Sequence, residues 1–456
     1  MKQVTQTDAY MRTPQKQSSK GEHWMQDTQY PSALEAATYA VTKLENDALF
    51  NSGHGAVFTR DGINELEASV MVSRGFAKRG VGVTGLKRVK NPILLAKAML
   101  EHGDKDLVGN TDLGWSRESS GTDLDVPSAQ GHTLVHGETA ETLARKYGRD
   151  LVEAGYFFTQ KRWDEHVRGL EKEKEGKGTA TWSAEAYLPQ GTCGAVALDE
   201  HGVICVATST GGMTNKLTGR IGDTPVVGAG FWAEEWTEDG DPGMSRARSV
   251  PDPWRNLQEY LNIPGPVVEL SSSLRAFLAD CLPSPFTYTP ITPTQRGSAH
   301  LDNSIKDEDV RVTRSVAMSG TGNGDSFLRL AATRTVASIA RWSRMPAVSA
   351  LNRIAGRGGE LEKSAGDRWG KTGEGEGGMI GIECVVGRDE SGAVLYTRSA
   401  ILQDHNCAGM FRAWVNDDGR SEMRIWHVDE DRTRGTDARS FVSEEKGEVV
   451  LAHGCN

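Results

Sequence analysis

The chain has 456 residues and a mass of 49.5 kDa, enough for one large domain or several ordinary ones. Its formal net charge of -10 argues against a surface that follows phosphates, so we expect no nucleic-acid partner. No apolar run approaches the roughly 20 residues of a membrane helix, and the first thirty residues lack the apolar core of a signal peptide. We therefore expect a cytoplasmic protein with no membrane partner, whose six scattered cysteines are reduced.

The chain begins with a polar stretch that precedes the first predicted helix. Residues 1–30 show little periodicity and are expected to form a disordered arm. Ser32 and Glu35 have the spacing of a capping box, which predicts a helix that runs to about Lys43.

Short elements are predicted over the next hundred residues. Apolar stretches at 56–58 and 68–71 predict strands, and Asn-Pro before residue 93 predicts a helix over 93–100. A stretch rich in Gly, Asp and Ser at 102–130 is typical of a surface insertion, and a further helix is predicted at 138–147.

The middle of the chain combines a charged stretch with a hairpin signal. Residues 160–191 are dense in charge and then rich in small residues, which predicts a solvated helix end and a flexible linker. Two apolar runs, 193–198 and 203–208, flank a short polar turn and predict a β-hairpin. Thr192 would then lie at the very start of a strand.

The remaining third contains an insertion, a helix and closing strands. Prolines concentrate between about 240 and 310, which indicates a second surface insertion. Apolar spacing predicts one helix over 326–342, and strands are predicted at 379–386 and 393–396. Strands and helices in both halves favour a layered α/β architecture.

Several ordered motifs resemble one known family, the plant-type L-asparaginases and isoaspartyl aminopeptidases (asparaginase type 2). They lie at 44–55, 191–199, 207–216, 219–225, 321–325 and 406–414. The resemblance implies an autoprocessed N-terminal-nucleophile hydrolase, a four-layer αββα sandwich. It also implies two subunits, an α subunit at 31–191 and a β subunit that starts at the nucleophile and spans 192–456.

Thr192 is the predicted nucleophile, and the Gly191–Thr192 bond is the predicted cleavage site. A threonine hydroxyl is a poor nucleophile near neutral pH unless a base lies beside it. If Thr192 becomes a chain terminus, its own α-amino group, with a pKa of about 7.7 to 8.0, supplies that base. Gly191 suits a strained scissile peptide because glycine tolerates unusual backbone angles.

Two further threonines follow on the next predicted strand. By resemblance, Thr210 bonds and orients the nucleophile. Thr208 is two residues earlier and therefore on the same face of the strand, but for Thr208 we favour a packing role.

Arg220 and Asp223 are three residues apart in a glycine-flanked loop, so their opposite charges can converge on one small ligand. An amino-acid zwitterion needs such a pair, a guanidinium for its carboxylate and a carboxylate for its ammonium. A loop salt bridge is the alternative use of this pair. Both positions match the substrate clamp of the family.

Residues Thr321, Gly322, Asn323 and Gly324 precede a predicted helix, where free backbone N–H groups favour negative charge. We expect all four to contact substrate. The resemblance implies that Thr321 and Gly322 form the oxyanion hole.

No cofactor is expected for catalysis, but the resemblance implies a structural sodium ion held by backbone carbonyls. The matching positions are Leu44, Glu45, Asp47, Phe50, Ser52 and His54. His132 and His136 flank a strand-like tripeptide that would hold their rings roughly 13 Å apart, so no transition metal is predicted.

The chain departs from the family pattern in two places. Family members begin with a strand that ends in His-Gly-Gly-Ala-Gly and lies beside the nucleophile strand, and this run does not occur here. We expect the sandwich to lack an edge strand or to recruit another segment. Cys193 stands where the family has a small aliphatic residue, a place that a buried thiol can fill.

The resemblance implies hydrolysis of L-asparagine, of β-aspartyl dipeptides, or of both. It also implies an αβ heterodimer that assembles as a dimer of such units. Glycosylasparaginase and the protein-cleaving threonine aspartase are alternative relatives. An alternative from another class is a binding protein on the same fold. Such a protein would have lost catalysis and would sense an amino acid through Arg220 and Asp223.

Overall fold

The computed structural model describes residues 32–74, 77–108, 129, 131–175, 191–238, 310–415 and 420–425. Residues 1–239 and 311–456 form one compact unit, and residues 240–310 form a second. All elements described below belong to the first unit. The predicted arm at 1–30 lies outside the described residues, as do most of the predicted insertions at 102–130 and 240–310.

Within the described part of the chain, five strands form the first sheet, in the order β3-β2-β1-β5-β4. They are β1 (Leu66–Arg74), β2 (Ala77–Leu86), β3 (Leu134–His136), β4 (Cys193–Leu198) and β5 (Ile204–Thr210). Neighbours run antiparallel except β2 and β3, which run parallel. The predicted hairpin is confirmed in β4 and β5, and in its turn the Asp199 carboxylate accepts N–H bonds from His201 and Val203.

Four antiparallel strands of the described ranges form the second sheet, in the order β6-β7-β8-β9. They are β6 (Phe231–Glu238), β7 (Arg311–Gly322), β8 (Gly377–Arg388) and β9 (Val394–His405). The strands predicted at 379–386 and 393–396 are confirmed within β8 and β9, although β9 continues to His405. A separate hairpin consists of β10 (Arg412–Val415) and β11 (Ser421–Arg424).

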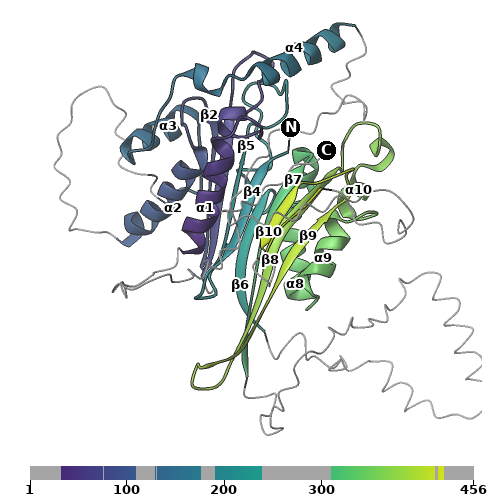
Figure 1. The fold of residues 1–456 in the computed structure, drawn as a ribbon. Helices are drawn as coiled ribbons and strands as arrows, with labels where there is room; N and C mark the ends of the chain where they lie inside the picture. The colour runs from purple at the N-terminus through teal and green to yellow at the C-terminus, as the bar shows by residue number, and fades with distance from the viewer. Residues whose placement is uncertain are drawn as a thin grey trace, which may run out of the picture. The chain divides into compact units, whose positions relative to one another are not determined.

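Helices cover the outer face of each sheet, and the inner faces of the sheets pack on each other (Figure 1). On the first sheet lie α1 (Ala33–Glu45), α2 (Pro92–Val108) and α3 (Gly137–Lys146), and on the second lie α8 (Ala332–Trp342) and α9 (Ala347–Ala355). Between the sheets, β1 packs on β6, β5 on β6 and β7, and β4 on β7 and β8. The elements therefore follow the order helix, sheet, sheet, helix, and the expected α/β class is confirmed.

The local signals of α1 account for its position. The capping box is present, since Ser32 N–H donates to the Glu35 carboxylate at 3.0 Å and Glu35 N–H donates to Ser32 Oγ at 3.3 Å. The inner face of the helix is made of small residues such as Ala37 and Ala40, both fully buried. Because alanine is small, the helix axis can approach β4 and β5 closely.

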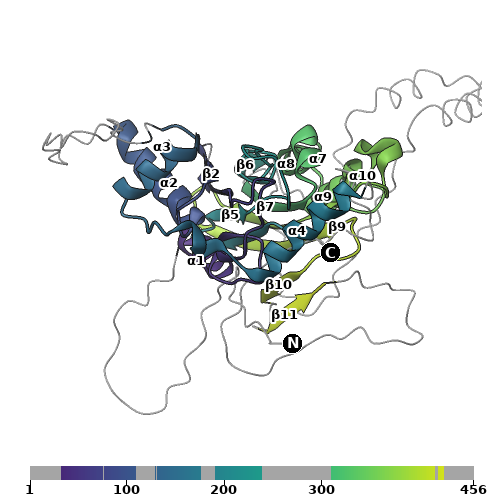
Figure 2. The same cartoon turned by 90° about the horizontal axis from the view of Figure 1, so that it is seen from above.

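The predicted linker at 160–191 begins instead with a helix, α4 (Gln160–Lys174). Figure 2 shows α4 over one end of the sheets. Buried Arg162 donates to the Gly55 carbonyl at 2.9 Å, and buried His166 hydrogen-bonds the Asn215 side chain. These inward residues hold the helix against the loops, and the rest of the predicted linker, 176–190, lies outside the described residues.

The single helix predicted over 326–342 is wrong. The chain breaks at Ala331, whose φ of 44° is left-handed, into α7 (Gly324–Leu330) and α8. The Thr335 hydroxyl donates to the Leu330 carbonyl at 2.6 Å across this break. The sequence has no glycine or proline at this position, and the apolar residues keep helical spacing through it. The break is therefore imposed by tertiary packing and could not be predicted from the local sequence.

The strand predicted at 56–58 is also wrong. Side-chain amides take the place of a neighbouring strand: Val57 N–H donates to Asn51 Oδ1, and Asn64 Nδ2 donates to the carbonyls of Ala56 and Val57. The chain is buried and extended there without pairing in a sheet.

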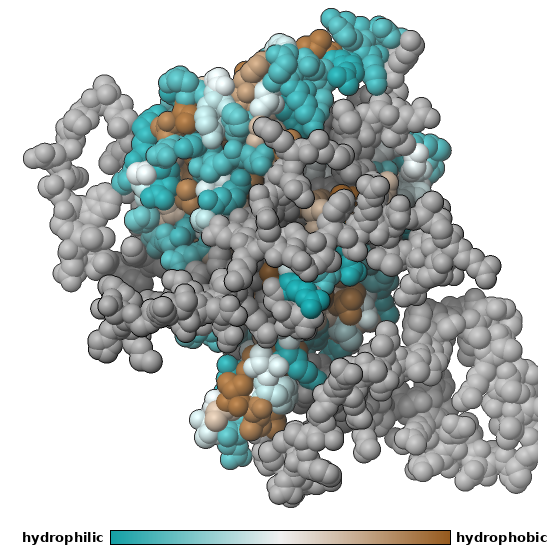
Figure 3. All heavy atoms as spheres, viewed as in Figure 1, coloured by the Kyte–Doolittle hydropathy of each residue, from teal (hydrophilic) through white to brown (hydrophobic). Residues whose placement is uncertain are grey.

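The smaller described elements are η1 (Gly53–Gly55), η2 (Ala154–Phe157), α10 (Glu360–Ser364) and η4 (Gly366–Arg368). None of the described helices is long and apolar enough to cross a membrane. In Figure 3 an apolar area covers the lower tip, where the β8–β9 hairpin projects and Val394 is 58% exposed. Among the described residues, Cys193, Cys205, Cys384 and Cys407 are buried and form no disulfide, and the other two cysteines lie outside these residues.

Candidate active site

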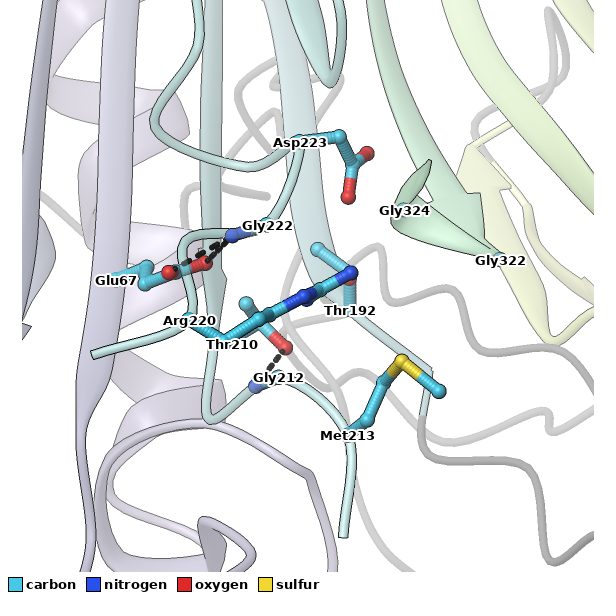
Figure 4. A pocket seen from close by; sticks show the side chains of 10 residues that line it. All are labelled: Glu67, Thr192, Thr210, Gly212, Met213, Arg220, Gly222, Asp223, Gly322 and Gly324. Carbon is cyan, nitrogen blue, oxygen red and sulfur yellow. Dashed lines mark hydrogen bonds between the residues drawn. The ribbon is translucent and has the colours of Figure 1, made fainter. Parts of the chain in front are cut away.

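A pocket with ≈ 430 Å³ of empty space lies where β4 begins and where β5 and β7 end. It is lined by Glu67, Thr192, Thr210, Gly212, Met213, Arg220, Gly222, Asp223, Gly322 and Gly324 (Figure 4). Six of these residues were predicted as site residues from the sequence. The fold therefore brings together segments from both sheets that are up to 257 positions apart in the chain, from Glu67 to Gly324.

Thr192 lies one residue before β4 and is buried. Cys193 pairs with Ser209 in the β4–β5 register, so Thr192 lies opposite Thr210 at the end of the hairpin. Gly191 precedes it and is partly exposed. Burial raises the pKa of the Cys193 thiol to about 12, so this neighbour stays protonated and packs as a small apolar group.

The two threonines of β5 have different surroundings. The Thr210 hydroxyl oxygen accepts the Gly212 N–H at 3.0 Å, which keeps it at the pocket wall. The Thr208 hydroxyl shares a hydrogen bond of 2.8 Å with Ser319 of β7, across the interface between the sheets. The packing role favoured for Thr208 agrees with this contact.

Arg220 and Asp223 both project into the pocket (Figure 4). Asp223 is 5% exposed, and its Oδ2 atom has no hydrogen-bond partner among the described residues. Burial raises the pKa of Asp223 from 3.8 to about 7, against the lowering effect of the Arg220 charge. A buried carboxylate with an unused oxygen is suited to bind a cation such as an ammonium group.

Arg220 also reaches a second acid, since its Nη2 lies 3.0 Å from Oδ1 of Asp325 at the start of α7. Asp325 is largely exposed, so this ion pair contributes little to stability. The Arg220 side chain is only 19% exposed, and its guanidinium has other N–H groups that can bind a ligand carboxylate.

Two glycines allow the end of β7 to approach the clamp and the neighbouring strand. A Cβ atom on Gly324 would lie 2.6 Å from Asp223 Oδ1 and 3.0 Å from Arg220 Nη2, so any side chain there would collide with both clamp residues. Gly322 has a φ of 145°, and a Cβ there would lie 2.4 Å from the Glu376 carbonyl oxygen. Both positions therefore require glycine.

Thr321 and Asn323 do not line the pocket. Thr321 is fully buried in β7, paired with Gly378 of β8. The Asn323 side chain caps α7 by accepting from Ser326 N–H at 3.0 Å. Asn323 therefore has a structural use for the side chain that was expected to contact substrate.

Glu67 is a site residue that was not predicted from the sequence. It is 1% exposed, lines the pocket from β1, and accepts hydrogen bonds from Gly222 N–H at 3.0 Å and from Thr84 Oγ1 at 3.2 Å. It therefore anchors the loop that carries Arg220 and Asp223. A charged residue inside a strand of apolar neighbours was the available signal.

Lys216 is a second buried charge beside the pocket. Its Nζ donates to the Glu65 carbonyl at 3.0 Å, and a Cβ on Gly212 would lie 2.9 Å from it, so the missing side chain of Gly212 leaves room for Lys216. Burial lowers the pKa of Lys216, and the nearby carboxylates of Glu67 and Glu65 oppose that effect. This residue connects the loop after β5 to the strand region before β1.

The loop predicted to hold sodium folds back tightly on itself after α1. Backbone bonds run from Asp47 N–H to Leu44, from Phe50 N–H to Asp47, and from Gly55 N–H to Ser52. A Cβ on Gly53 would lie 2.3 Å from the Glu45 carbonyl oxygen, and one on Gly55 would lie 2.1 Å from that of Phe50. His54 instead turns its Nδ1 to the Tyr156 carbonyl at 2.6 Å.

Carbonyl oxygens thus crowd the inside of this loop, a donor set that suits a hard cation. The Glu45 side chain faces the protein interior, where its Oε1 accepts from Ser209 Oγ and Ile93 N–H. Within the described ranges, no group of three or more His, Cys, Asp or Glu side chains is placed to hold a metal ion.

The chain is similar to known amidohydrolases. A family model described as Asparaginase matches residues 4–114 and 125–237. A putative isoaspartyl peptidase/L-asparaginase of Dictyostelium discoideum is 34% identical over 243 residues, 47% of this chain and 62% of that protein. An isoaspartyl peptidase of Escherichia coli K12 is 36% identical over 236 residues, 51% of this chain and 61% of that protein.

An isoaspartyl peptidase/L-asparaginase of Rattus norvegicus is 36% identical over 203 residues, 44% of this chain and 50% of that protein. The chain thus spans between half and about three fifths of the length of these relatives. The matched stretches include Thr192, Thr210, Arg220 and Asp223, which meet in one pocket. By its motifs and its matches, the chain belongs to the plant-type asparaginase family.

Proposed function

We propose that this protein is a threonine-nucleophile amidohydrolase of the N-terminal-nucleophile sandwich class, acting on L-asparagine, β-aspartyl dipeptides, or both. One observation carries the proposal: the Thr192 side chain shares a single pocket with Arg220 and Asp223. A nucleophile and a zwitterion clamp within one small cavity suit an α-amino acid whose side-chain carbonyl reaches the nucleophile.

The charges of the clamp fix how the substrate binds. The α-carboxylate pairs with the Arg220 guanidinium, and the α-ammonium pairs with Asp223. The ammonium occupies the space beside the unused Oδ2 atom and favours the ionised carboxylate, so binding lowers the raised pKa of Asp223. The side-chain amide then extends toward Thr192.

Activation proceeds within the chain itself. The Thr192 Oγ attacks the Gly191 carbonyl carbon, the C–N bond breaks, and the acyl group passes from nitrogen to oxygen. Water then hydrolyses the ester, which leaves a carboxylate on Gly191 and a free α-amine on Thr192. That amine is the base that the hydroxyl lacks in the precursor.

Hydrolysis of substrate repeats the same chemistry on another carbonyl. The Thr192 amine accepts the hydroxyl proton as Oγ attacks the side-chain carbonyl carbon. We assign stabilisation of the negative oxygen to Gly322, which lines the pocket, and to the adjacent Thr321, which does not line it in the unliganded chain. The C–N bond breaks, the leaving amine takes the proton, and a β-aspartyl ester forms. Water cleaves that ester and releases aspartate.

The loop after α1 would hold a structural sodium ion through its carbonyl groups, at Leu44, Glu45, Asp47, Phe50, Ser52 and His54. The tight backbone of that loop supports this part of the proposal. A bound cation would rigidify the segment beside Cys193, and thereby the start of β4. We also propose that the cleaved halves stay together as an αβ unit and that two such units associate.

The test is to follow freshly purified chain by intact mass, together with release of ammonia and of free amino acid from the two substrates. Cleavage after Gly191 gives about 21 and 29 kDa from 49.5 kDa, in fragments that stay associated because they share one core. Thr192→Ala should remain intact and inactive, and Thr192→Ser should cleave more slowly.

Intact chain that still hydrolyses asparagine would refute the nucleophile assignment. Intact, inactive chain that binds aspartate would instead make it an amino-acid binder, the alternative that the clamp alone supports.

A further inference from the structure

The loop that follows β5, residues 211–220, carries part of the pocket wall and the guanidinium of the clamp. Its Gly212, Met213 and Arg220 line the pocket (Figure 4). Asn215 stands between them and has a φ of 58°, in the left-handed region. Asparagine is one of the few residues besides glycine that adopt this conformation readily, so the turn depends on the residue type at this position.

The Asn215 side chain is held by α4 through two hydrogen bonds to one residue. Its Nδ2 donates to the His166 carbonyl at 3.1 Å, and its Oδ1 accepts from Nδ1 of the His166 ring. Because a carbonyl oxygen only accepts, the amide orientation is fixed, and the ring carries a proton on Nδ1. The Asn215 N–H donates to the Phe58 carbonyl at 2.8 Å. The turn is therefore anchored to two segments that are far away in the sequence.

A glycine allows α4 to approach the loop closely. A Cβ atom on Gly169 would lie 2.5 Å from Nδ2 of Asn215, so a side chain there would displace the amide. Glycine inside a helix is unfavourable compared with alanine, because its backbone loses more conformational freedom on folding. The contact with Asn215 accounts for a glycine at this position of α4.

His166 is itself held firmly in the structure. It is 4% exposed, and its ring centroid lies 5.0 Å from that of Trp163 and 5.9 Å from that of Phe58. Four residues earlier on the same face of α4, Arg162 donates to the Gly55 carbonyl at 2.9 Å. The helix is thus fixed by contacts outside the loop, and the loop conforms to it.

Short-range backbone bonds carry the position of Asn215 along the loop. Lys216 N–H donates to the Met213 carbonyl at 3.2 Å and closes a turn that contains Asn215. Arg220 N–H donates to the Leu217 carbonyl at 3.0 Å, which makes a second turn that ends at the clamp. A change at Asn215 would therefore displace Met213 on one side and Arg220 on the other.

We propose that Asn215, held by His166 of α4, is a positioning residue that sets the affinity for the amino-acid part of the substrate. It acts by placing Met213 and Arg220, and neither Asn215 nor His166 is among the residues that line the pocket. The inference rests on the proposed function, in which the Arg220 guanidinium binds the α-carboxylate. Thr192 lies before β4, outside this loop, so loss of the contact should raise KM and leave kcat nearly unchanged.

The test is steady-state kinetics on asparagine and on a β-aspartyl dipeptide, with the melting temperature as the check on folding. Asn215→Ala removes both side-chain bonds and disfavours the left-handed turn, so KM should rise at least about tenfold while kcat stays within about threefold of the parent. Asn215→Gly accepts the left-handed φ and removes only the bonds to His166, so it should show most of the same rise. A normal KM in Asn215→Gly would assign the effect to the backbone turn and overturn the role of α4.

Substitutions on α4 test the same contact from the other side. His166→Ala should raise KM, and the double variant with Asn215→Ala should be no worse than Asn215→Ala because both changes remove one contact. His166→Asn places an amide N–H near the position of the ring Nδ1–H and should recover most of the affinity, a rescue that a general loss of stability would not show. Arg168→Ala, at an exposed position of α4, is the matched control and should leave KM unchanged. Additive rises in KM, or a fall in kcat with KM unchanged, would overturn the proposal.

Failure of this proposal and failure of the proposed function give different results. An active parent whose KM does not respond to Asn215→Gly or His166→Ala would overturn the positioning role alone. If the parent hydrolyses neither substrate, calorimetric binding of aspartate replaces KM, and a loss of affinity in Asn215→Gly would support the positioning role while refuting the hydrolase. A parent that binds no aspartate and hydrolyses neither substrate would overturn both.

Discussion

Replacing Asp223 by asparagine should stabilise the unliganded protein at alkaline pH while removing its ability to bind an ammonium group. The carboxyl is 5% exposed, and no partner reaches its Oδ2 atom. In the folded chain the ionised form is therefore poorly solvated, although Arg220 compensates in part. Asparagine has nearly the same shape and carries no charge.

The size of the effect follows from the pKa of Asp223, which rises from 3.8 to about 7 on folding. One pKa unit corresponds to about 1.36 kcal/mol, so the fully ionised group costs at most roughly 4 kcal/mol of unfolding free energy. The folded state holds the proton more tightly than the unfolded state. Stability is therefore lost as the pH rises from 3.8 to about 7, and it stays lost above that range.

The assay is the melting temperature of Asp223→Asn against the parent, both as Thr192→Ala, at pH 5 and pH 8. We expect a gain on the order of 1 to 4 kcal/mol at pH 8, and about a third of that gain at pH 5, where the folded carboxyl is mostly protonated. Asp325→Asn is the control, because its carboxylate contacts the same Arg220 but is largely exposed. An equal gain at both pH values, or a loss at pH 8, would refute the reasoning.

Substitutions at three positions test the site further. Arg220→Ala should leave the chain folded and lower kcat/KM on asparagine, with a loss of at least about 2 kcal/mol in transition-state binding. Unchanged kcat/KM would exclude the role of Arg220 in a substrate clamp. Thr321→Val should lower kcat on the order of 100-fold with KM nearly constant, and a defect in KM alone would assign the loop to substrate binding. Glu67→Ala should raise KM several-fold because the Gly222 N–H loses its acceptor. Glu67→Gln keeps an acceptor oxygen and should recover most of the affinity, whereas a general loss of stability would not be rescued in this way.

Local chemistry made much of the fold predictable. The capping box at Ser32, the β4–β5 hairpin and the strands near 380 and 395 all depend on neighbours close in sequence, and the structure contains each of them. The strands β2 and β7 carry glycine, arginine or lysine at several positions, which weakens the alternation that marks a strand. Their place is decided by pairing with distant strands.

The site residues that lie in sequence motifs were predictable, whereas the residues that only the tertiary structure brings into the site were not. Thr192, Arg220 and Asp223 lie in short recognisable segments, and the structure places all three in one pocket. Asn323 lies in such a segment too, but its side chain caps α7. Sequence resemblance locates a residue in the chain, whereas its hydrogen bonds decide how its side chain is used.

Glu67 shows why part of the site required the structure. On β1 it is a single acid between Leu66 and Ala68, and this local signal marks an unusual strand residue without saying what the carboxylate contacts. Its importance comes from residues far along the chain: Thr210 lies opposite it on β5, and the Gly222 N–H donates to it. Because this carboxylate also raises the pKa of Asp223, it makes the clamp more costly to ionise while holding its loop in place. In the proposed function a substrate ammonium relieves that cost, so the buried acids of this pocket would favour the bound state over the empty one.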